Sequence, residues 1–125
     1  MHNTPMPSDI NKDLTAASAT PLTLSILASE DSYGYAIIKR VKELSQGSVE
    51  WTEGMLYPVL HRLEKQELIE SYWQGVSGER RRKYYRITDK GRATLAILME
   101  QWITVDAALK GSQKGEKNVR SRKRS

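Results

Sequence analysis

The sequence predicts a mainly α-helical fold with one small β-hairpin and a long C-terminal helix. Apolar residues recur at spacings of three and four in several separate segments, which is the period of amphipathic helices. Residues 68–88 are instead rich in strand-forming residues, interrupted by a turn that contains Gly and Ser. The chain has 125 residues, which is room for one domain and little more.

The positive charge is concentrated at the C-terminal end. From Lys110 to Ser125 there are seven Lys or Arg and one acid, a net charge of +6, and because the whole chain carries +5, residues 1–109 carry −1. Overall basicity is therefore weak support for a nucleic-acid partner. Without cysteine the chain has no disulfides or thiolate metal sites. No apolar run approaches the roughly 18–20 residues of a membrane span. We therefore expect a soluble, intracellular protein.

Residues 1–20 are predicted to form an N-terminal arm and a short helix. The helix covers Ile10–Ala19 and ends at Thr20, because the residue before a proline disfavours the helical region. Pro21 is then expected to open a second, largely buried helix.

The next helix is predicted from about Tyr33 to Leu44. Asp31 or Ser32 is its expected N-cap, and Gly47 is expected to end it with a positive φ. Its predicted inner stripe consists of Ile37, Ile38, Val41 and Leu44.

Residues 52–66 predict a short helix with two different faces, which Thr52 caps. Its apolar stripe is Leu56, Val59, Leu60 and Leu63. The other face carries Tyr57, His61 and Lys65, with Arg62 beside them. Pro58 predicts an irregular first turn or a kink. Helices that read a nucleic-acid groove have these two faces, and so do many ordinary surface helices.

Leu68–Trp73 and Arg82–Thr88 are the two predicted strands of the hairpin. Two helices joined by a short Gly-containing connection, followed by a hairpin, is the order of a winged helix-turn-helix, predicted here over residues 21–88. The hairpin would place its cations along DNA phosphates. A solvated basic surface is the alternative. These cations are Arg80, Arg81, Arg82 and Lys83.

Thr88 is the expected cap of a last helix over residues 89–109, roughly 30 Å long at 1.5 Å per residue. Its apolar stripe is longer than a small domain needs, which predicts pairing with a second copy. The alternative is a helix that folds back on its own domain. The stripe consists of Leu95, Leu98, Met99, Trp102, Val105 and Leu109. Residues 110–125 hold only one apolar side chain, Val119, and are expected to be disordered.

Several motifs of this chain resemble those of the PadR family of bacterial transcriptional regulators, in its short PadR-like form. The resemblance covers about residues 14–108. Met55 and Glu67 depart from the family pattern, which more often has a small hydroxyl residue and a glycine there. The motifs are Tyr33-Gly34-Tyr35, Glu53–Glu64 with its Leu-Tyr-Pro element, Leu68–Ser71, Arg80–Tyr85 and Ile87–Arg92.

The resemblance implies a homodimeric repressor of the bacterial cytoplasm, associated with the nucleoid when bound. Each subunit would place residues 52–65 in a major groove of an inverted-repeat operator in double-stranded DNA, with its hairpin over the flanking backbone. Dimerisation would use residues 89–109 and the N-terminal helix. The DNA contacts implied are Tyr33, Thr52, Gly54, Tyr57, Pro58, His61 and Lys65.

The resemblance also implies a small aromatic effector that releases the repressor, bound beside an aromatic residue of the dimer helix. Trp102 occupies that place, although the simpler role, which we favour from the sequence, is to fill the dimer seam. The sequence predicts no catalytic residue, cofactor or metal site, since His61 lacks a Cys or Ser partner at motif spacing. Two alternatives stay open: a winged-helix interaction or dimerisation module without specific DNA binding, and an RNA-binding protein that uses the hairpin and tail.

Overall fold

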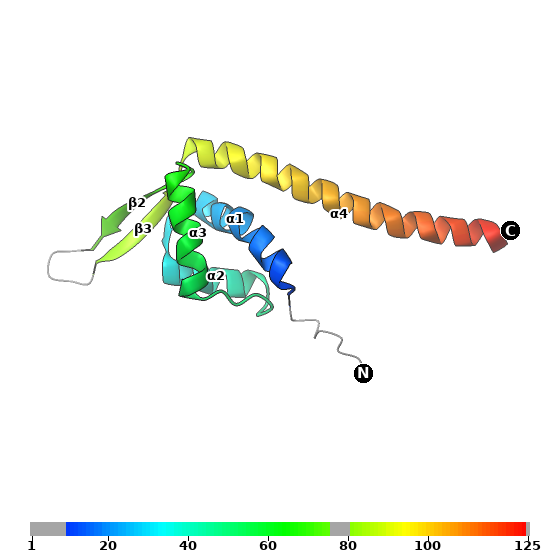
Figure 1. Cartoon of the computed structure of the whole chain (residues 1–125), viewed down its shortest axis with the longest axis horizontal. Coiled ribbons are helices and arrows are strands. Elements are labelled where there is room, and N and C mark those ends of the chain that lie inside the picture. The colour runs from blue at the N-terminus through cyan, green and yellow to red at the C-terminus, as the bar shows by residue number, and fades with distance from the viewer. Residues whose placement is uncertain (1–9, 76–80, 125) are drawn as a thin grey trace. The chain divides into compact units, whose positions relative to one another are not determined.

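The computed structural model describes residues 10–75 and 81–124, with side chains through Lys114. The described residues form α1 (Lys12–Ser29), β1 (Ser32–Tyr33), α2 (Gly34–Leu44), α3 (Glu53–Lys65), β2 (Ile69–Gln74), β3 (Arg82–Ile87) and α4 (Asp89–Arg124). Figure 1 shows α1, α2 and α3 grouped together, with the β2–β3 hairpin projecting beside them. The predicted fold class, mainly helical with a winged helix-turn-helix order and a long last helix, is confirmed.

The chain contains two compact units, one up to Leu95 and the other from Ala96 onward, so α4 contributes to both. Among the described residues, no helix combines the length and the apolar character that crossing a lipid bilayer requires. The winged helix-turn-helix lies entirely in the first unit.

α1 is one continuous helix, so the prediction of two helices separated at Thr20 was wrong. Pro21 lies inside α1, where a proline costs about 3 kcal/mol relative to alanine. Leu24 and Leu27 in the following turn are buried, and burial of each contributes about 2 kcal/mol. Packing of the C-terminal half of α1 therefore offsets the proline.

α2 begins at Gly34, one residue later than predicted, and its N-cap is Tyr33 rather than Asp31 or Ser32. The Asp31 carboxylate is engaged elsewhere, because it accepts a hydrogen bond of 2.6 Å from the Tyr72 hydroxyl. This bond raises the pKa of Tyr72. Ser32 and Tyr33 form the short strand β1, which the sequence analysis did not predict.

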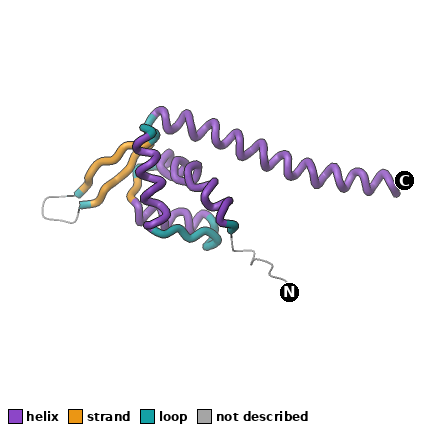
Figure 2. The backbone as a smooth tube through the Cα atoms, in the orientation of Figure 1, coloured by secondary structure: helices purple, strands orange, loops and turns teal. Residues whose placement is uncertain are grey.

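The three strands form an antiparallel sheet in the order β1-β3-β2 (Figure 2). The register places Tyr84 opposite Tyr33 on one side and opposite Tyr72 on the other. These three rings form a row, with centroids 5.2 Å apart between Tyr33 and Tyr84 and 5.8 Å apart between Tyr84 and Tyr72. The alternate residues Tyr85 and Ile87 are buried, so β3 has one face toward the core and one partly open face.

The core lies where α1, α2, α3 and the inner face of the sheet meet. Leu44 is not part of it, although it was predicted to be, because it lies at the end of α2 beside an open groove and is 51% exposed. Gly47 has the predicted positive φ, at 85°, and Gln46 before it has φ 54°. The apolar core side chains that are buried to 1% exposure or less are Leu24, Leu27, Ile37, Val41, Leu56, Leu60, Leu63 and Ile69.

α4 begins as predicted, because the Thr88 hydroxyl accepts a hydrogen bond of 3.0 Å from the Gly91 backbone N–H. The sequence predicted that this helix would end near Leu109, whereas α4 continues to Arg124. That prediction relied on the lack of apolar residues. A helix, however, satisfies its backbone hydrogen bonds internally, and most residues after Lys110 are Lys, Arg, Gln, Glu, Asn or Ser, with no proline.

Candidate nucleic-acid interface

α3 divides into a buried face and an exposed face, as its sequence predicted. Leu56, Leu60 and Leu63 are buried, with Leu60 at 1% exposure. The predicted contact residues on and beside the other face are all exposed: Thr52, Gly54, Tyr57, Pro58, His61 and Lys65. The helix therefore presents aromatic, imidazole and ammonium groups to solvent while its opposite side anchors it in the core.

The first turn of α3 depends on Thr52 and tolerates Pro58. The Thr52 side chain accepts a hydrogen bond of 3.2 Å from the Met55 backbone N–H, which confirms the predicted cap. Pro58 lies within the helix without ending it. A proline cannot donate to the carbonyl four residues earlier, which belongs to Gly54. Because Gly54 and Pro58 are both exposed, that carbonyl stays open to water or to a ligand.

Tyr57 is both exposed and anchored. Its side chain is 44% exposed, but its hydroxyl end lies against Gly34 at the start of α2. A Cβ atom added at Gly34 would lie 2.5 Å from the Tyr57 hydroxyl oxygen. Gly34 therefore leaves the space that the phenol occupies, and Tyr57 fixes the start of α2 against α3.

Two hydrogen bonds hold the C-terminal half of α3 to its neighbours. The Arg62 guanidinium donates to the Thr20 hydroxyl of α1 at 2.6 Å. The Ser71 hydroxyl of β2 donates to the Glu64 carboxylate at 2.6 Å. Arg62 was predicted to lie beside the outward-facing residues, and it is exposed, but its guanidinium is engaged with α1.

Three cations predicted for the hairpin lie over aromatic rings. The pairs, with their distances from cation to ring centroid, are Arg81 over Trp73 at 5.8 Å, Arg82 over Tyr33 at 4.6 Å and Lys83 over Tyr85 at 5.7 Å. Each such contact stabilises the position of the cation by about 0.5–1 kcal/mol at an exposed site. The fourth predicted cation, Arg80, lies outside the described residues.

Trp73 is a candidate that the sequence analysis missed. It was counted only as a strand former, yet it is 58% exposed and lies under Arg81. In the sequence, the alternation of a strand places Trp73 on the same face of β2 as Ile69 and Ser71. Of these three side chains only Ile69 is buried, so this face becomes open toward the end of the strand. A large aromatic side chain left open at the far end of a strand is available to a ligand.

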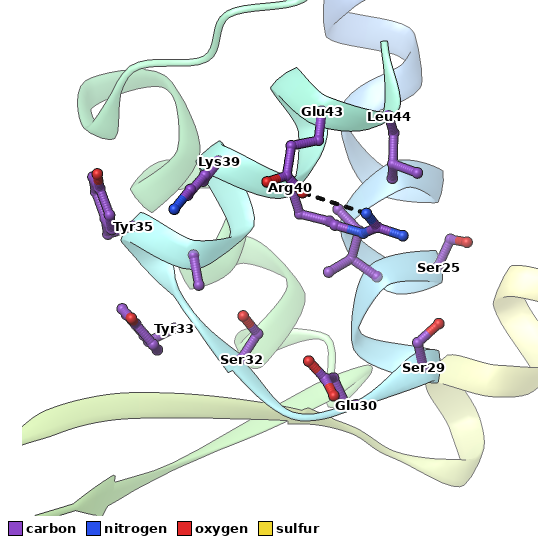
Figure 3. A pocket seen from close by; sticks show the side chains of 12 residues that line it. Ser25, Ser29, Glu30, Ser32, Tyr33, Tyr35, Lys39, Arg40, Glu43 and Leu44 are labelled. Carbon is purple, nitrogen blue, oxygen red and sulfur yellow. Dashed lines mark hydrogen bonds and ion pairs between the residues drawn. The ribbon is translucent and has the colours of Figure 1, made fainter. Parts of the chain in front are cut away.

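An open groove of about 690 Å³ lies between α1 and α2 and was not predicted (Figure 3). Its rim carries Lys39 and Arg40 together with Glu30 and Glu43. Arg40 is 3.4 Å from the Glu43 carboxylate. The two carboxylates offset the two cations, so the groove offers no charge-selective site for a phosphate backbone. Nowhere in residues 10–75 and 81–114 do three His, Asp or Glu side chains gather in a way that could hold a metal ion.

The family model described as the transcriptional regulator PadR-like family matches residues 23–97. The chain belongs to that family. The resemblance of the Tyr33–Arg92 motifs is thereby confirmed, and the function class is DNA-binding transcriptional regulation.

Relatives of this PadR-like chain include an uncharacterized protein of Lysinibacillus sphaericus, 36% identical over 96 residues that cover 77% of this chain and 88% of the relative. The transcriptional regulator YqjI of Escherichia coli is 32% identical over 87 residues, which are 70% of this chain but only 40% of that regulator. Among solved structures, a transcriptional regulator from Clostridium thermocellum superposes with a TM-score of 0.73 at 31% identity, covering 79% of this chain and 96% of that one. A PadR family transcription regulator from Clostridium difficile gives a TM-score of 0.66 at 37% identity, covering 74% and 95%.

Proposed function

We propose that this PadR-like chain is a sequence-specific repressor that binds an inverted-repeat operator as a homodimer and is released by a small-molecule effector. The observation that carries the proposal is the exposed face of α3, opposite a face whose leucines are buried. A helix anchored on one side and open on the other fits the major groove of B-DNA, which is about 12 Å wide.

The chemistry of the exposed face suits a groove contact. His61 and Lys65 lie one turn apart and can donate hydrogen bonds to base edges or phosphates. The ring of Tyr57 can contact a sugar or a thymine methyl group. Gly54 has no side chain, so its backbone can approach a phosphate closely.

The hairpin would contact the phosphates that flank the groove. Arg81, Arg82 and Lys83 are the cations for this role, and Tyr33 lies under Arg82 at the start of α2. Because aromatic rings already hold these cations, less side-chain entropy is lost when they bind phosphate. Trp73 adds an exposed apolar surface beside them.

Homodimerisation would use the apolar stripe of α4. Val105 and Leu109 are 54% and 65% exposed, and Met99 is exposed as well, while Leu95, Leu98 and Trp102 are partly covered. Near the N-terminus Ile10 and Leu14 are also exposed. Contiguous exposed apolar side chains of this kind mark interaction surfaces, and a second copy would bury them.

The effector would be a small aromatic compound that stacks on Trp102 within the dimer. A flat ligand between facing indole rings gains stacking and apolar burial. The other role for Trp102 is to fill the dimer seam without a ligand. Trp102 fluorescence, measured in a protein whose Trp51 and Trp73 are replaced by Phe, separates the two roles, because only ligand binding quenches it in titrations with aromatic compounds.

The test of the proposed function begins with selecting duplexes from a random library with the purified full chain. Affinity for the selected duplex and for a scrambled one is then compared over a range of salt concentrations. Specific affinity typically exceeds non-specific affinity by about 10³-fold or more. His61→Ala with Lys65→Ala should remove that preference. Equal affinity for both duplexes would favour an interaction module, and stronger binding to RNA at equal salt would favour the RNA-binding alternative.

A further inference from the structure

α3 ends in a turn that normally contains glycine. The Leu68 backbone N–H donates to the Leu63 carbonyl at 2.9 Å, and the Glu67 N–H donates to the Glu64 carbonyl at 3.0 Å. This pair of bonds is the Schellman motif, whose middle residue lies in the left-handed region. Glu67 occupies that position with φ 63°. The end of α3 is therefore a tight, strained turn whose geometry decides where the helix points.

Thr88 joins this exit turn to the start of α4. Its hydroxyl donates to the Glu67 carbonyl at 2.7 Å, and its backbone N–H donates to the Leu68 carbonyl at 3.0 Å. The same hydroxyl accepts from the Gly91 N–H at 3.0 Å. The side chain of Thr88 thus caps α4 and holds the Glu67 carbonyl, while its backbone N–H holds the Leu68 carbonyl.

Gly91 shows how closely the two segments approach. A Cβ atom at this position would overlap the Leu68 carbonyl oxygen and would lie 2.7 Å from Cγ1 of Ile87. The first turn of α4 therefore lies directly on the backbone of the exit turn. Both segments belong to the compact unit that ends at Leu95.

We infer that Thr88 is a positioning residue for DNA recognition: its hydroxyl locks the exit turn of α3 onto the first turn of α4 and so fixes the angle at which α3 meets DNA. α3 is about 20 Å long at 1.5 Å per residue, so a tilt of about 10° moves its far end by about 3 Å. Hydrogen bonds to base edges tolerate a change of only a few tenths of an ångström in the distance between donor and acceptor. This inference rests on the proposed function.

Three substitutions separate this coupling from the capping of α4. Thr88→Ser keeps the hydroxyl and both of its bonds. Thr88→Asp keeps an acceptor for the Gly91 N–H and remains a good N-cap, but it has no proton to donate to the Glu67 carbonyl. Thr88→Val keeps the shape of the side chain and loses both bonds. If the Asp and Val variants both lose preference for the selected duplex and the Ser variant keeps it, the lost preference is due to the hydrogen bond with the Glu67 carbonyl.

The measurement is the ratio of affinities for the library-selected duplex and a scrambled duplex, together with thermal melts of the free proteins. We expect Thr88→Asp and Thr88→Val to lower the ratio at least tenfold while affinity for scrambled duplex stays within twofold. Thr88→Ser should match the wild type. If the Val variant melts below the assay temperature, the Asp variant decides, because its cap is intact.

Three results would overturn the inference alone. The first is a wild-type affinity ratio in the Asp variant, and the second is an equal loss in the Ser variant. The third is a loss that appears equally on scrambled duplex, because a merely structural defect weakens all binding. If the wild-type chain itself has no preference for the selected duplex, the proposed function fails together with the inference.

Discussion

α3 and α4 both carry apolar side chains at spacings of three and four, but their surroundings differ. The stripe of α3 is covered by its own chain, with Leu60 at 1% exposure, whereas Leu109 in the stripe of α4 is 65% exposed. The same spacing therefore predicts which face of a helix is apolar, but not what covers that face. For α3 the cover is the intramolecular core, and for α4 we propose a second copy.

The largest expected effect is on the covered stripe of α3. Leu60→Ala removes a buried side chain, and such substitutions cost about 2–5 kcal/mol in the free energy of unfolding. The neighbouring substitution His61→Ala should change it by less than about 0.5 kcal/mol, because His61 is exposed. Urea denaturation of both variants measures the difference. Equal destabilisation would show that α3 does not have two faces.

The exposed stripe of α4 should respond in association rather than in folding. Val105→Lys with Leu109→Lys places two charges where a second copy would pack. We expect the dissociation constant of the homodimer to rise by at least about 10²-fold, since burial of each apolar side chain is worth about 1.5–3 kcal/mol. Sedimentation equilibrium at micromolar concentration measures the change.

Ile97→Lys is the control for the position of a lysine on α4. Ile97 is also exposed, but at 3.6 residues per turn it lies about 160° around the helix from Leu95. This variant should remain dimeric. A monomer in both cases, or a dimer in both, would contradict the assignment of the stripe as the dimer interface.

The next effect concerns the junction at which α3 leads into α4. Gly91→Ala would place a methyl group on the Leu68 carbonyl oxygen, and overpacking against backbone costs about 1–3 kcal/mol or more. Gly111→Ala is the control, because nothing lies within 4 Å of a Cβ atom added there. Alanine is the better helix former by about 1 kcal/mol, so this change should raise the helix content of α4. Circular dichroism melts of both proteins test the contrast.

The sequence predicted features that depend on neighbouring residues and missed features that depend on distant ones. The cap at Thr52 and the buried face around Leu60 follow from local spacing, and both are present. β1 has only two residues, too short for any periodicity, and it exists because Ser32 and Tyr33 pair with Tyr85 and Tyr84 far along the chain.

The same distinction holds at the candidate interface. The exposure of His61 and Lys65 could be predicted from their spacing. The contact of Tyr57 with Gly34 could not, because it requires the packing of α2 against α3. The bond between Arg62 and Thr20 joins residues 42 apart in the sequence. The continuous helix through Pro21 likewise reflects burial of later residues, which outweighs the local preference.

A smaller effect is expected from the hairpin. Arg81→Ala with Lys83→Ala should weaken binding to every duplex, because these cations would contact phosphates rather than bases. Loss of two phosphate contacts lowers the slope of log K against log salt by about 1.8. Arg40→Ala with Lys42→Ala removes the same charge from α2, where both cations already pair with carboxylates, and should leave the slope unchanged. An unchanged slope in the first variant would exclude the hairpin from phosphate binding.

The smallest expected effect is a gain in stability at the ends of α2 and α3. Both helices end in Schellman turns, and in each turn the first residue after the C-cap has a left-handed backbone without being glycine: Gln46 has φ 54° and Glu67 has φ 63°. Left-handed backbone costs a side-chain-bearing residue about 1–2 kcal/mol, while glycine adopts it freely. The greater entropy of glycine in the unfolded chain offsets about 0.5–1 kcal/mol of that gain. Glu67→Gly and Gln46→Gly should therefore each stabilise the fold by about 0.5–1 kcal/mol, measured by urea denaturation.

The two glycine variants should differ in what they do to DNA binding. Glu67 lies in the turn that Thr88 holds, so relaxing its backbone would let the Glu67 carbonyl shift away from the Thr88 hydroxyl, now 2.7 Å away. Gln46 has no such link, since the bonds of its turn go to Lys42 and Glu43 within α2. Glu67→Gly should therefore lower the preference for the selected duplex even as it raises stability, and Gln46→Gly should raise stability alone. If both variants keep the full preference, strain at Glu67 has no part in placing α3, and its glutamate is only a tolerated departure from glycine.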